Sequence, residues 1–569
     1  MQTSSLPTLD ETTPLIINNS QSLESDAAST ESDSSGDEAP KKPLTFEIMS
    51  MLSVLFTGVL VANVDMTFMV ATYPQISSEL HAFRDGSWLL ISYMLAMCAS
   101  QPLYGKLSNI FGRKRLLIAA YLLYALGSCI CAVSRDIRQI IVGRVIGGAG
   151  GAGLVCLVSI IITDVVPLRE VAVYRSYVNV VQTIGRSLGA PVGGLVVEKL
   201  GWRVAFACIG SFTAAGALLV AWRLKLGGNG SSKRDQERVH ESSWELLKMV
   251  DFLGSIFLSL SIVALLLIFS LGGEKLAWDD PRIFVLAAGT IAFGGLFYAT
   301  ETYWAAEPIF PPSLLTRRPV LTSYSLLALQ NAAQGAASLS IPLFFQVLLS
   351  VGPSAAGSYL LPSVVGNTVG GLITGMYIKR YGRYKFPFFV AGLVSVCAYT
   401  MMCLRWGTEP GFMPVLEDMY IIGGGLGTGM VHAAAFVVLT AGPPATPVEE
   451  QGERHHDEQV QENIAITGSG IYLSGNIGGT IGFSLSSATL RWMVEHSLAQ
   501  HLTGKELEYV RKKALESVGW VQGLRDGSRL KGIVVDAYVS GAHGTFVVAT
   551  VCSALTIVVS LFIIEHKLR

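Results

Sequence analysis

The chain has 569 residues, of which 51% are hydrophobic and only 15% charged, and its mean hydropathy is +0.48. A soluble chain of this length would carry far more charge, so this composition excludes an ordinary soluble protein and predicts many membrane-spanning helices. The formal net charge of −1 gives no excess of cations for nucleic acid, so we expect no nucleic-acid partner.

Residues 1–47 precede the first long apolar run and are rich in serine, threonine and acidic residues. This composition has too few apolar groups to fold, and it predicts a disordered acidic tail on the cytoplasmic side. Within the tail, Glu11, Leu15 and Ile16 have the spacing of an acidic dileucine sorting signal. The motif predicts a sorting adaptor as a partner, and the alternative is a chance match.

Fourteen apolar segments follow, each near the roughly 20 residues that cross a bilayer as a helix. They predict an all-α polytopic membrane protein in contact with the lipid bilayer. We expect Pro342 to break the ninth segment, because proline removes a backbone donor. The segments lie near residues 49–72, 88–107, 116–134, 138–163, 173–197, 204–223, 250–271, 283–303, 320–349, 354–377, 386–404, 414–440, 464–490 and 543–564.

The cations set the expected orientation. Lysine and arginine gather in the loops after even-numbered segments, and we place Arg169 and Arg175 in the loop after the fourth. Because such loops stay on the cytoplasmic side, both termini are predicted to be cytoplasmic. The loop 493–542 then lies on the far side, and residues 505–518 within it have the periodicity of an amphipathic helix.

A basic turn between the second and third segments is the most particular motif. It runs from Gly105 to Arg115, and its glycines allow close approach of the helix ends. The residues that we assign to a gating loop are Gly105, Asn109, Gly112, Arg113 and Lys114. An ordinary basic loop of any polytopic protein is the alternative.

The turn recurs later in the chain. Gly375, Gly382, Arg383 and Lys385 repeat the spacing of Gly105, Gly112, Arg113 and Arg115. The repeat predicts two six-helix bundles with two extra helices between them. The expected domains are the tail, an N-terminal bundle, a linker with the inserted helices, and a C-terminal bundle: 1–47, 48–225, 226–305 and 306–569.

These patterns resemble the major facilitator superfamily, and within it the 14-helix drug:proton antiporters. The turn matches the loop after helix 2, except that Asn109 stands where the family usually has aspartate, which puts a charge-dependent gate latch in doubt. The sequence Asn63-Val-Asp-Met-Thr67 resembles the helix 1 signature, and Arg144 with the following glycines resembles the helix 4 motif. The positions that resemble the antiporter motif of helix 5 include Gly189, Pro191, Gly193 and Gly194. With the dileucine tail, the chain is similar to fungal vacuolar basic amino-acid transporters.

Asp65 is the candidate proton site. An ionisable group inside a bilayer is costly unless it faces protein or water, so this carboxyl group should face the interior of the bundle. It can hold a proton or pair with a cation, and competition between the two is the minimum requirement for an antiporter. The alternative is a structural ion pair with an arginine. Arg144 is either a fixed charge that couples protonation to gating or part of a packing ion pair.

The fifth segment carries a polar face. Asn179, Gln182 and Arg186 are spaced three and four residues apart, so they share one side of a helix. A guanidinium grips a carboxylate well, and we expect Arg186 to bind the substrate's carboxylate and Asp65 its cationic end. The alternative is that Arg186 only neutralises Asp65 or lies near a helix end.

Together these features predict a transporter and not an enzyme, with no cofactor and no metal site. The preferred function is proton-coupled antiport of basic amino acids into an acidic vacuole. One alternative is a plasma-membrane exporter of drugs or toxins, and another is an amino-acid sensor without useful flux. The substrate is a small molecule, and its partner in exchange is the proton.

Overall fold

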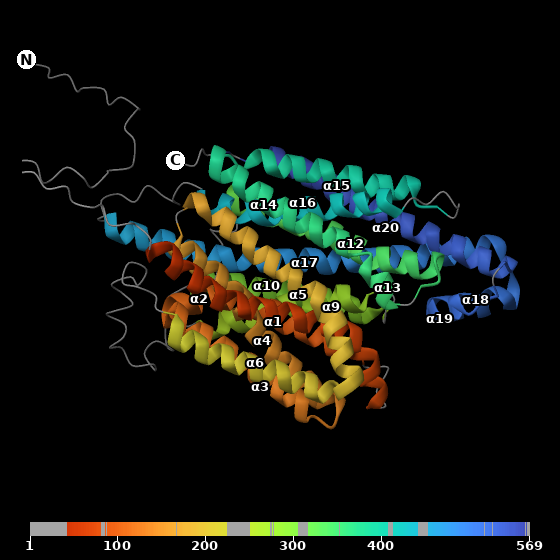
Figure 1. Cartoon of the computed structure of the whole chain (residues 1–569), viewed down its shortest axis with the longest axis horizontal. Helices are drawn as coiled ribbons and strands as arrows, with labels where there is room; N and C mark the ends of the chain where they lie inside the picture. The colour runs from red at the N-terminus through yellow and green to blue at the C-terminus, as the bar shows by residue number, and fades with distance from the viewer. Residues whose placement is uncertain are drawn as a thin grey trace, which may run out of the picture. The chain divides into compact units, whose positions relative to one another are not determined.

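The structure is a computed structural model, drawn in Figure 1. It describes residues 43–80, 86, 88–166, 168–224, 251–272, 276, 278–304, 317–351, 353–407, 414–441, 453–516, 518–525, 527–563 and 565. The chain divides into two units, Met1–Ile48 and Met49–Arg569. Of the first unit, the structure describes only the start of the first helix, so the sorting residues Glu11, Leu15 and Ile16 lie outside the described residues.

The first half of the second unit is built from long helices. The six that precede the linker are α1 (Pro43–Glu79), α2 (Trp88–Phe111), α3 (Arg113–Val133), α4 (Ile137–Val165), α5 (Leu168–Leu200) and α6 (Trp202–Arg223). Helices α3 and α4 pack together, α2 packs on α4, and α6 packs on α3 and α5. A hairpin of α9 (Phe252–Leu271) and α10 (Pro281–Tyr303) follows.

The second half repeats this arrangement. Its helices are α12 (Arg318–Leu348), the short α13 (Pro353–Ser358), α14 (Leu361–Tyr381), α15 (Lys385–Arg405), α16 (Pro414–Ala441), α17 (Glu453–His501), the short α18 (Gly504–Glu516) and α19 (Val518–Gln522), and α20 (Arg529–Leu561). In Figure 1, α14, α15 and α16 run beside one another, and α20 packs on α12, α15 and α17. The halves meet where α5 packs on α14 and α16, and where α2 packs on α17.

The predicted all-α membrane fold is confirmed. The described residues hold fourteen helices of 20 residues or more, and nine of these have the length and hydropathy of a membrane span. The five others are α2, α5, α12, α14 and α17, whose polar side chains lower the hydropathy. Four of these five are the helices that join the halves, where protein shields polar groups from lipid. Large apolar side chains such as Leu218, Ile291 and Val285 are exposed on the outer surface.

The repeat of the basic turn is visible in its contacts. Gly112 and Gly382 have φ of 82° and 65°, a backbone region that favours glycine, and each ends its helix at the turn. Lys114 Nζ donates to the carbonyl of Ala221 at the end of α6, at 2.8 Å. Lys385 Nζ donates to the carbonyl of Leu561 at the end of α20, at 2.9 Å. Each turn therefore caps the last helix of its own half.

Several predicted boundaries were wrong. Helix α12 continues through Pro342 without a break. Helix α14 starts at Leu361, seven residues later than its predicted start at 354, because α13 and a turn precede it. The predicted loop 493–542 is largely helical, since α17 extends to His501 and α20 begins at Arg529. Hydropathy marks only the apolar part of a helix, and these two continue beyond it.

The helix predicted at 505–518 is confirmed as α18 (Gly504–Glu516). Together with α19 it covers one end of the second half. Val510, Ala514 and Val521 are buried against Leu498 and Val534 of α17 and α20. Tyr538 donates its hydroxyl to the Ala514 carbonyl at 2.6 Å, which fixes α18 on α20.

Candidate functional site

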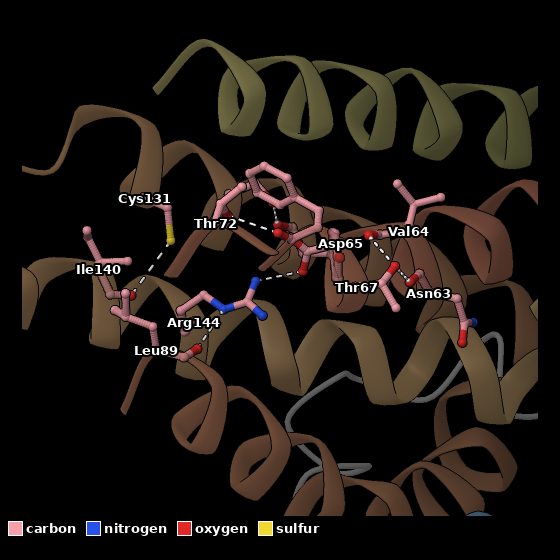
Figure 2. A network of polar contacts seen from close by, with 12 residues as sticks. Asn63, Val64, Asp65, Thr67, Thr72, Leu89, Cys131, Ile140 and Arg144 are labelled. Atoms are coloured by element: carbon pink, nitrogen blue, oxygen red, sulfur yellow. Dashed lines mark hydrogen bonds and ion pairs between the residues drawn. The ribbon is translucent and has the colours of Figure 1, made fainter. Parts of the chain in front are cut away.

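Asp65 of α1 and Arg144 of α4 form a buried ion pair near the start of α2 (Figure 2). Arg144 Nη1 lies 2.6 Å from Asp65 Oδ2, and the two side chains are 4% and 2% exposed. Arg144 Nε donates to the Leu89 carbonyl at 3.2 Å, and its guanidinium lies 4.2 Å from the ring centre of Tyr93. Helices α1, α2 and α4 thus meet at this pair. Such a pair is stable only while both charges are present, because either one alone would be buried without compensation.

One oxygen of the Asp65 carboxylate does not take part in the ion pair with Arg144. Asp65 Oδ1 accepts no hydrogen bond from the described residues. The hydroxyls of Tyr93 and Tyr124 are buried beside the pair. Oδ1 is therefore the carboxylate oxygen that Arg144 does not occupy.

The polar face of α5 is present as predicted, and it meets several elements. Arg186 is exposed, and its Nε donates to Asn63 Oδ1 of α1 at 3.0 Å. Asn179 is buried and donates to Asn367 Oδ1 of α14 at 2.6 Å, and Gln182 is also buried. Arg186 and Asp65 therefore have different partners on different helices. In this conformation Arg186 does not neutralise Asp65, because Asp65 is paired with Arg144.

The glycines of the antiporter motif hold α5 tightly on α1. A Cβ on Gly189 would lie 2.2 Å from the Val64 carbonyl oxygen, and one on Gly193 would lie 2.3 Å from a ring carbon of Phe68. A larger residue at Gly189 would collide with the backbone of α1, and one at Gly193 would displace the Phe68 side chain. Both contacts flank Asp65 along α1, so a displacement of Asp65 must pass to α5. Pro191 and Gly194 lie within the same continuous helix.

The gating loop is organised around Arg113. Its Nε lies 3.0 Å from Asp164 Oδ2 in the last turn of α4, and its Nη1 donates to Ser108 Oγ at 2.8 Å and to Asn109. Gly105 is buried in the last turns of α2. Asp164 supplies the carboxylate that the sequence lacks at Asn109, so the turn keeps a charged contact.

We expect Asp164→Asn to lower the maximal uptake rate about fivefold while the KM changes little. A partly buried ion pair contributes on the order of 1 kcal/mol, which is about a factor of five in the population of the state that it stabilises. Initial uptake rates over a range of substrate concentrations measure both quantities. Asn109→Asp is the matched control, since it adds a carboxylate beside Arg113 and should leave the rate near wild type. An unchanged rate in Asp164→Asn would show that the contact has no part in gating.

The two halves are joined by hydrogen bonds near the end of the helices that carries both basic turns, called here the basic-loop end. Arg175 Nη1 donates to Tyr472 Oη at 2.6 Å, and that hydroxyl is also hydrogen-bonded to Ser159 of α4. The guanidinium of Arg175 lies 4.5 Å from the ring centre of Phe436. The prediction that Arg175 lies in a loop was wrong, because α5 begins at Leu168 and buries it.

Further contacts join the same faces. Lys379 Nζ donates to Glu170 Oε1 at 2.7 Å between α14 and α5, and this hydrogen bond and the charge of Glu170 raise the pKa of Lys379. Asn476 of α17 donates to Gln101 of α2 at 3.2 Å. Ser176 donates to the Gly371 carbonyl at 2.6 Å. The halves are thus in contact at the basic-loop end in this conformation.

The second half offers one polar pair toward Arg186. The ring nitrogen of His432 in α16 lies 3.1 Å from the side-chain nitrogen of Asn331 in α12, with roles that depend on the histidine tautomer. Gln330 and Gln334 instead bond within their own half, to Ser395 and Ser363.

Comparison of the sequence with models of known protein families identifies the family of this chain. The family model described as Major Facilitator Superfamily matches residues 54–483, which span most of both halves and the Asp65–Arg144 pair. The chain belongs to the major facilitator superfamily. Members of this superfamily are transporters, and the chain is not an enzyme.

Two similar proteins come from one yeast. The chain is 29% identical over 522 residues to the multidrug resistance protein fnx1 of Schizosaccharomyces pombe, which covers 90% of this chain and 91% of that protein. It is 29% identical over 528 residues to the vacuolar membrane amino acid uptake transporter fnx2 of the same yeast, covering 92% and 85%. The crystal structure of the human organic anion transporter MFSD10 superposes with a TM-score of 0.53 at 14% identity, covering 90% of this chain and all of that one. That likeness supports the major facilitator fold alone.

Four residues of this site were missed by the sequence analysis. Tyr93 and Tyr124 surround the ion pair, Asp164 anchors the gating loop, and Tyr472 joins the halves. Aromatic residues in apolar segments give no separate signal, and Asp164 fell just past a predicted boundary. Among the described residues, no group of three histidine, cysteine or acidic side chains is arranged to hold a metal ion.

Proposed function

We propose that this transporter is a proton-coupled antiporter that moves amino acids, basic ones included, into the acidic vacuole. The buried Asp65–Arg144 pair is the observation that carries the proposal. It joins three helices and keeps one carboxylate oxygen available to a proton. The printed function of the relative fnx2, amino acid uptake at the vacuolar membrane, supports the substrate class and the membrane.

Protonation of Asp65 is the coupling step. In the acidic lumen a proton binds Oδ1, the carboxyl group loses its charge, and its attraction for Arg144 weakens. Arg144 then relies on the Leu89 carbonyl and the Tyr93 ring, which are weaker partners than a carboxylate. Helix α1 is freed from α4, and its close contact with α5 at Gly189 transmits the movement to the interface between the halves.

Arg186 binds the carboxylate of the substrate. It is exposed, it shares a face of α5 with Asn179, which contacts α14 of the second half, and its forked donors fit a carboxylate. Its present partner, the Asn63 amide oxygen, is neutral and can be displaced. The cationic end of a basic amino acid reaches Asp65 only in a state where Arg144 has released it. Proton and substrate cation then compete for the same carboxylate.

The test is uptake by isolated vacuoles energised by a proton gradient. Labelled lysine should accumulate in vacuoles that contain the protein, and a protonophore should abolish the accumulation. Lysine accumulation that is the same with and without the gradient would overturn the coupling. Binding without flux would instead identify an amino-acid sensor.

Export of drugs or toxins across the plasma membrane is the second candidate. It is favoured by the printed names of fnx1 and of the efflux pump LUC4 from Fusarium, which is 26% identical over 548 residues. The same proton coupling at Asp65 would drive it. Localisation separates the candidates, since a vacuolar protein cannot export drugs from the cell directly.

We predict that replacing Glu11, Leu15 and Ile16 together by alanine moves the protein from the vacuolar membrane to the cell surface. An adaptor reads the acidic residue and the two apolar residues together, so their loss removes the sorting step. Fluorescence microscopy of the tagged protein measures the change. Replacing the nearby Thr8, Thr12 and Thr13 by alanine is the matched control and should leave it in place. Vacuolar fluorescence of the first variant would mean that the motif is a chance match.

A further inference from the structure

Arg175 is a buried cation whose charge is not matched by a carboxylate of the residues that the structure describes. Its side chain is only 6% exposed. Arg113, Arg144 and Arg203 each have a carboxylate oxygen within 3.0 Å, but no described carboxylate comes within ion-pair distance of Arg175. Its Nε has no hydrogen-bond partner in the described part of the chain. A buried guanidinium is costly without a neutralising group, so a carboxylate that reached Arg175 would be bound favourably.

The contacts of Arg175 come from the opposite half. Tyr472 of α17 accepts its hydrogen bond at 2.6 Å, and the rings of Phe436 and Tyr472 lie 4.5 and 5.3 Å from its guanidinium carbon. If the halves part at the basic-loop end, α16 and α17 leave with the second half. Arg175 stays on α5 and presents a bare guanidinium to that side of the membrane.

We infer that Arg175 is a second carboxylate site, which receives the substrate from the basic-loop side before Arg186 does. The inference rests on the proposed function, in which Arg186 binds the substrate's carboxylate. Residues 175, 179, 182 and 186 are spaced four, three and four apart, so they share one face of α5. Eleven residues span about 17 Å of helix, too far for one amino acid to touch both arginines. The substrate therefore occupies them in turn, past Asn179 and Gln182.

The groups that contact Arg175 while the two halves are together fit a role in binding a carboxylate. A phenol hydroxyl and aromatic faces are neutral, and each such contact holds a cation less strongly than a carboxylate does. A substrate carboxylate is a stronger partner and can displace them. A carboxylate of the protein paired with Arg175 would instead compete with the substrate's carboxylate for the same guanidinium. Arg175 and Arg186, neither of which is paired with a carboxylate among the described residues, also disfavour a lipophilic cationic drug.

The experiment compares the two directions of transport in isolated vacuoles whose cytoplasmic face is outward. Labelled lysine uptake measures binding from the basic-loop side, and efflux from preloaded vacuoles measures binding from the lumen. We expect Arg175→Gln to raise the KM of uptake about tenfold, the usual loss for one charge-assisted contact, and to change the KM of efflux less than about twofold. Arg380→Gln, a change at an exposed arginine, is the matched control and should change neither value.

The variant Tyr472→Phe distinguishes two roles for Arg175: a site that binds the substrate, or a latch, meaning a residue that only holds the two halves together. It keeps the aromatic face but removes the hydroxyl that occupies Arg175. A carboxylate site then has less competition, so the KM of uptake should fall or stay within about twofold of wild type, opposite to Arg175→Gln. Raised KM values for both variants, equal in the two directions, would overturn the inference and leave Arg175 as a latch.

The outcomes for the two proposals are distinct. Wild-type vacuoles that take up no lysine overturn the proposed function itself. Uptake that is lost in Arg186→Ala but normal from both sides in Arg175→Gln overturns only the second site. If Arg175→Gln is not recovered in the membrane, Arg175→Lys keeps the charge without the fork. It should give an intermediate rise in the uptake KM, and an unchanged KM would count against the inference.

Discussion

Asp65→Asn is expected to abolish proton-driven uptake while the protein still reaches its membrane. The amide keeps an oxygen for Arg144 but cannot gain or lose a proton near neutral pH. Its attraction for Arg144 therefore no longer changes with the proton gradient. Arg144 loses its charge partner, which costs several kcal/mol at a buried site, and the hydrogen bond to the amide offsets part of this. Uptake of labelled lysine into energised vacuoles, with the amount of protein measured by immunoblot, gives the result.

Glu79→Gln is the matched control for this prediction. Glu79 also lies on α1 and also pairs with an arginine, Arg203, at 2.9 Å, but both side chains are more than 40% exposed. Hydrogen bonds from Arg203 and Trp202 lower the pKa of Glu79, so it stays ionised and does not carry protons at physiological pH. The Glu79→Gln variant should transport lysine at the wild-type rate. Wild-type uptake by a correctly placed Asp65→Asn protein would contradict the coupling role.

Arg186→Ala is expected to reduce lysine uptake by tenfold or more, about the loss of one charge-assisted hydrogen-bonded pair. A substrate carboxylate that leaves water needs a cationic partner, and alanine offers none. Arg186→Lys keeps the charge but not the planar fork, so weaker binding is expected and not its loss. The fold should tolerate these changes, because Asn63 also donates to the Val59 carbonyl at 2.8 Å within α1.

Inhibition of lysine uptake tests whether the transporter recognises the carboxylate of its substrate. Unlabelled lysine and cadaverine, which lacks the carboxylate, are compared as inhibitors of labelled lysine uptake. In the wild type, lysine should inhibit far better, and in Arg186→Ala the difference should shrink. Arg203→Ala serves as the matched arginine control and should keep the wild-type preference. Equal inhibition by both compounds in the wild type would favour the drug exporter and leave Arg186 as a structural charge.

Conformational change follows from the two sites together. The Asp65–Arg144 pair lies within the first half, whereas Arg175 and Tyr472 join the halves. The close contact of α1 with α5 at Gly189 and Gly193 links them, since α5 carries Arg175 and Arg186. In the proposed mechanism, proton binding at one site and substrate binding at the other bias the same movement of α5, which is the physical requirement for coupling.

The sequence by itself determined the class of the protein and the positions of its helices. Apolar segments of about 20 residues must cross a bilayer as helices, because lipid cannot satisfy the backbone, so hydropathy alone located them. It also identified Asp65 and Arg144, since charges within apolar segments stand out. The repeated turn predicted two similar halves, and Lys114 and Lys385 cap equivalent helices in the structure.

Only the tertiary structure decided which polar groups meet. Helical periodicity places Asp65 and Arg186 on faces of their own helices, but it carries no information about the neighbouring helix. The partners therefore could not be read in advance: Arg144 for Asp65, Asn63 for Arg186, Asp164 for Arg113, and Tyr472 for Arg175. Arg175 looked like a loop cation because its charge lowers the local hydropathy. Packing of the second half against α5 buries that charge, and such packing depends on residues almost 300 positions apart in the chain.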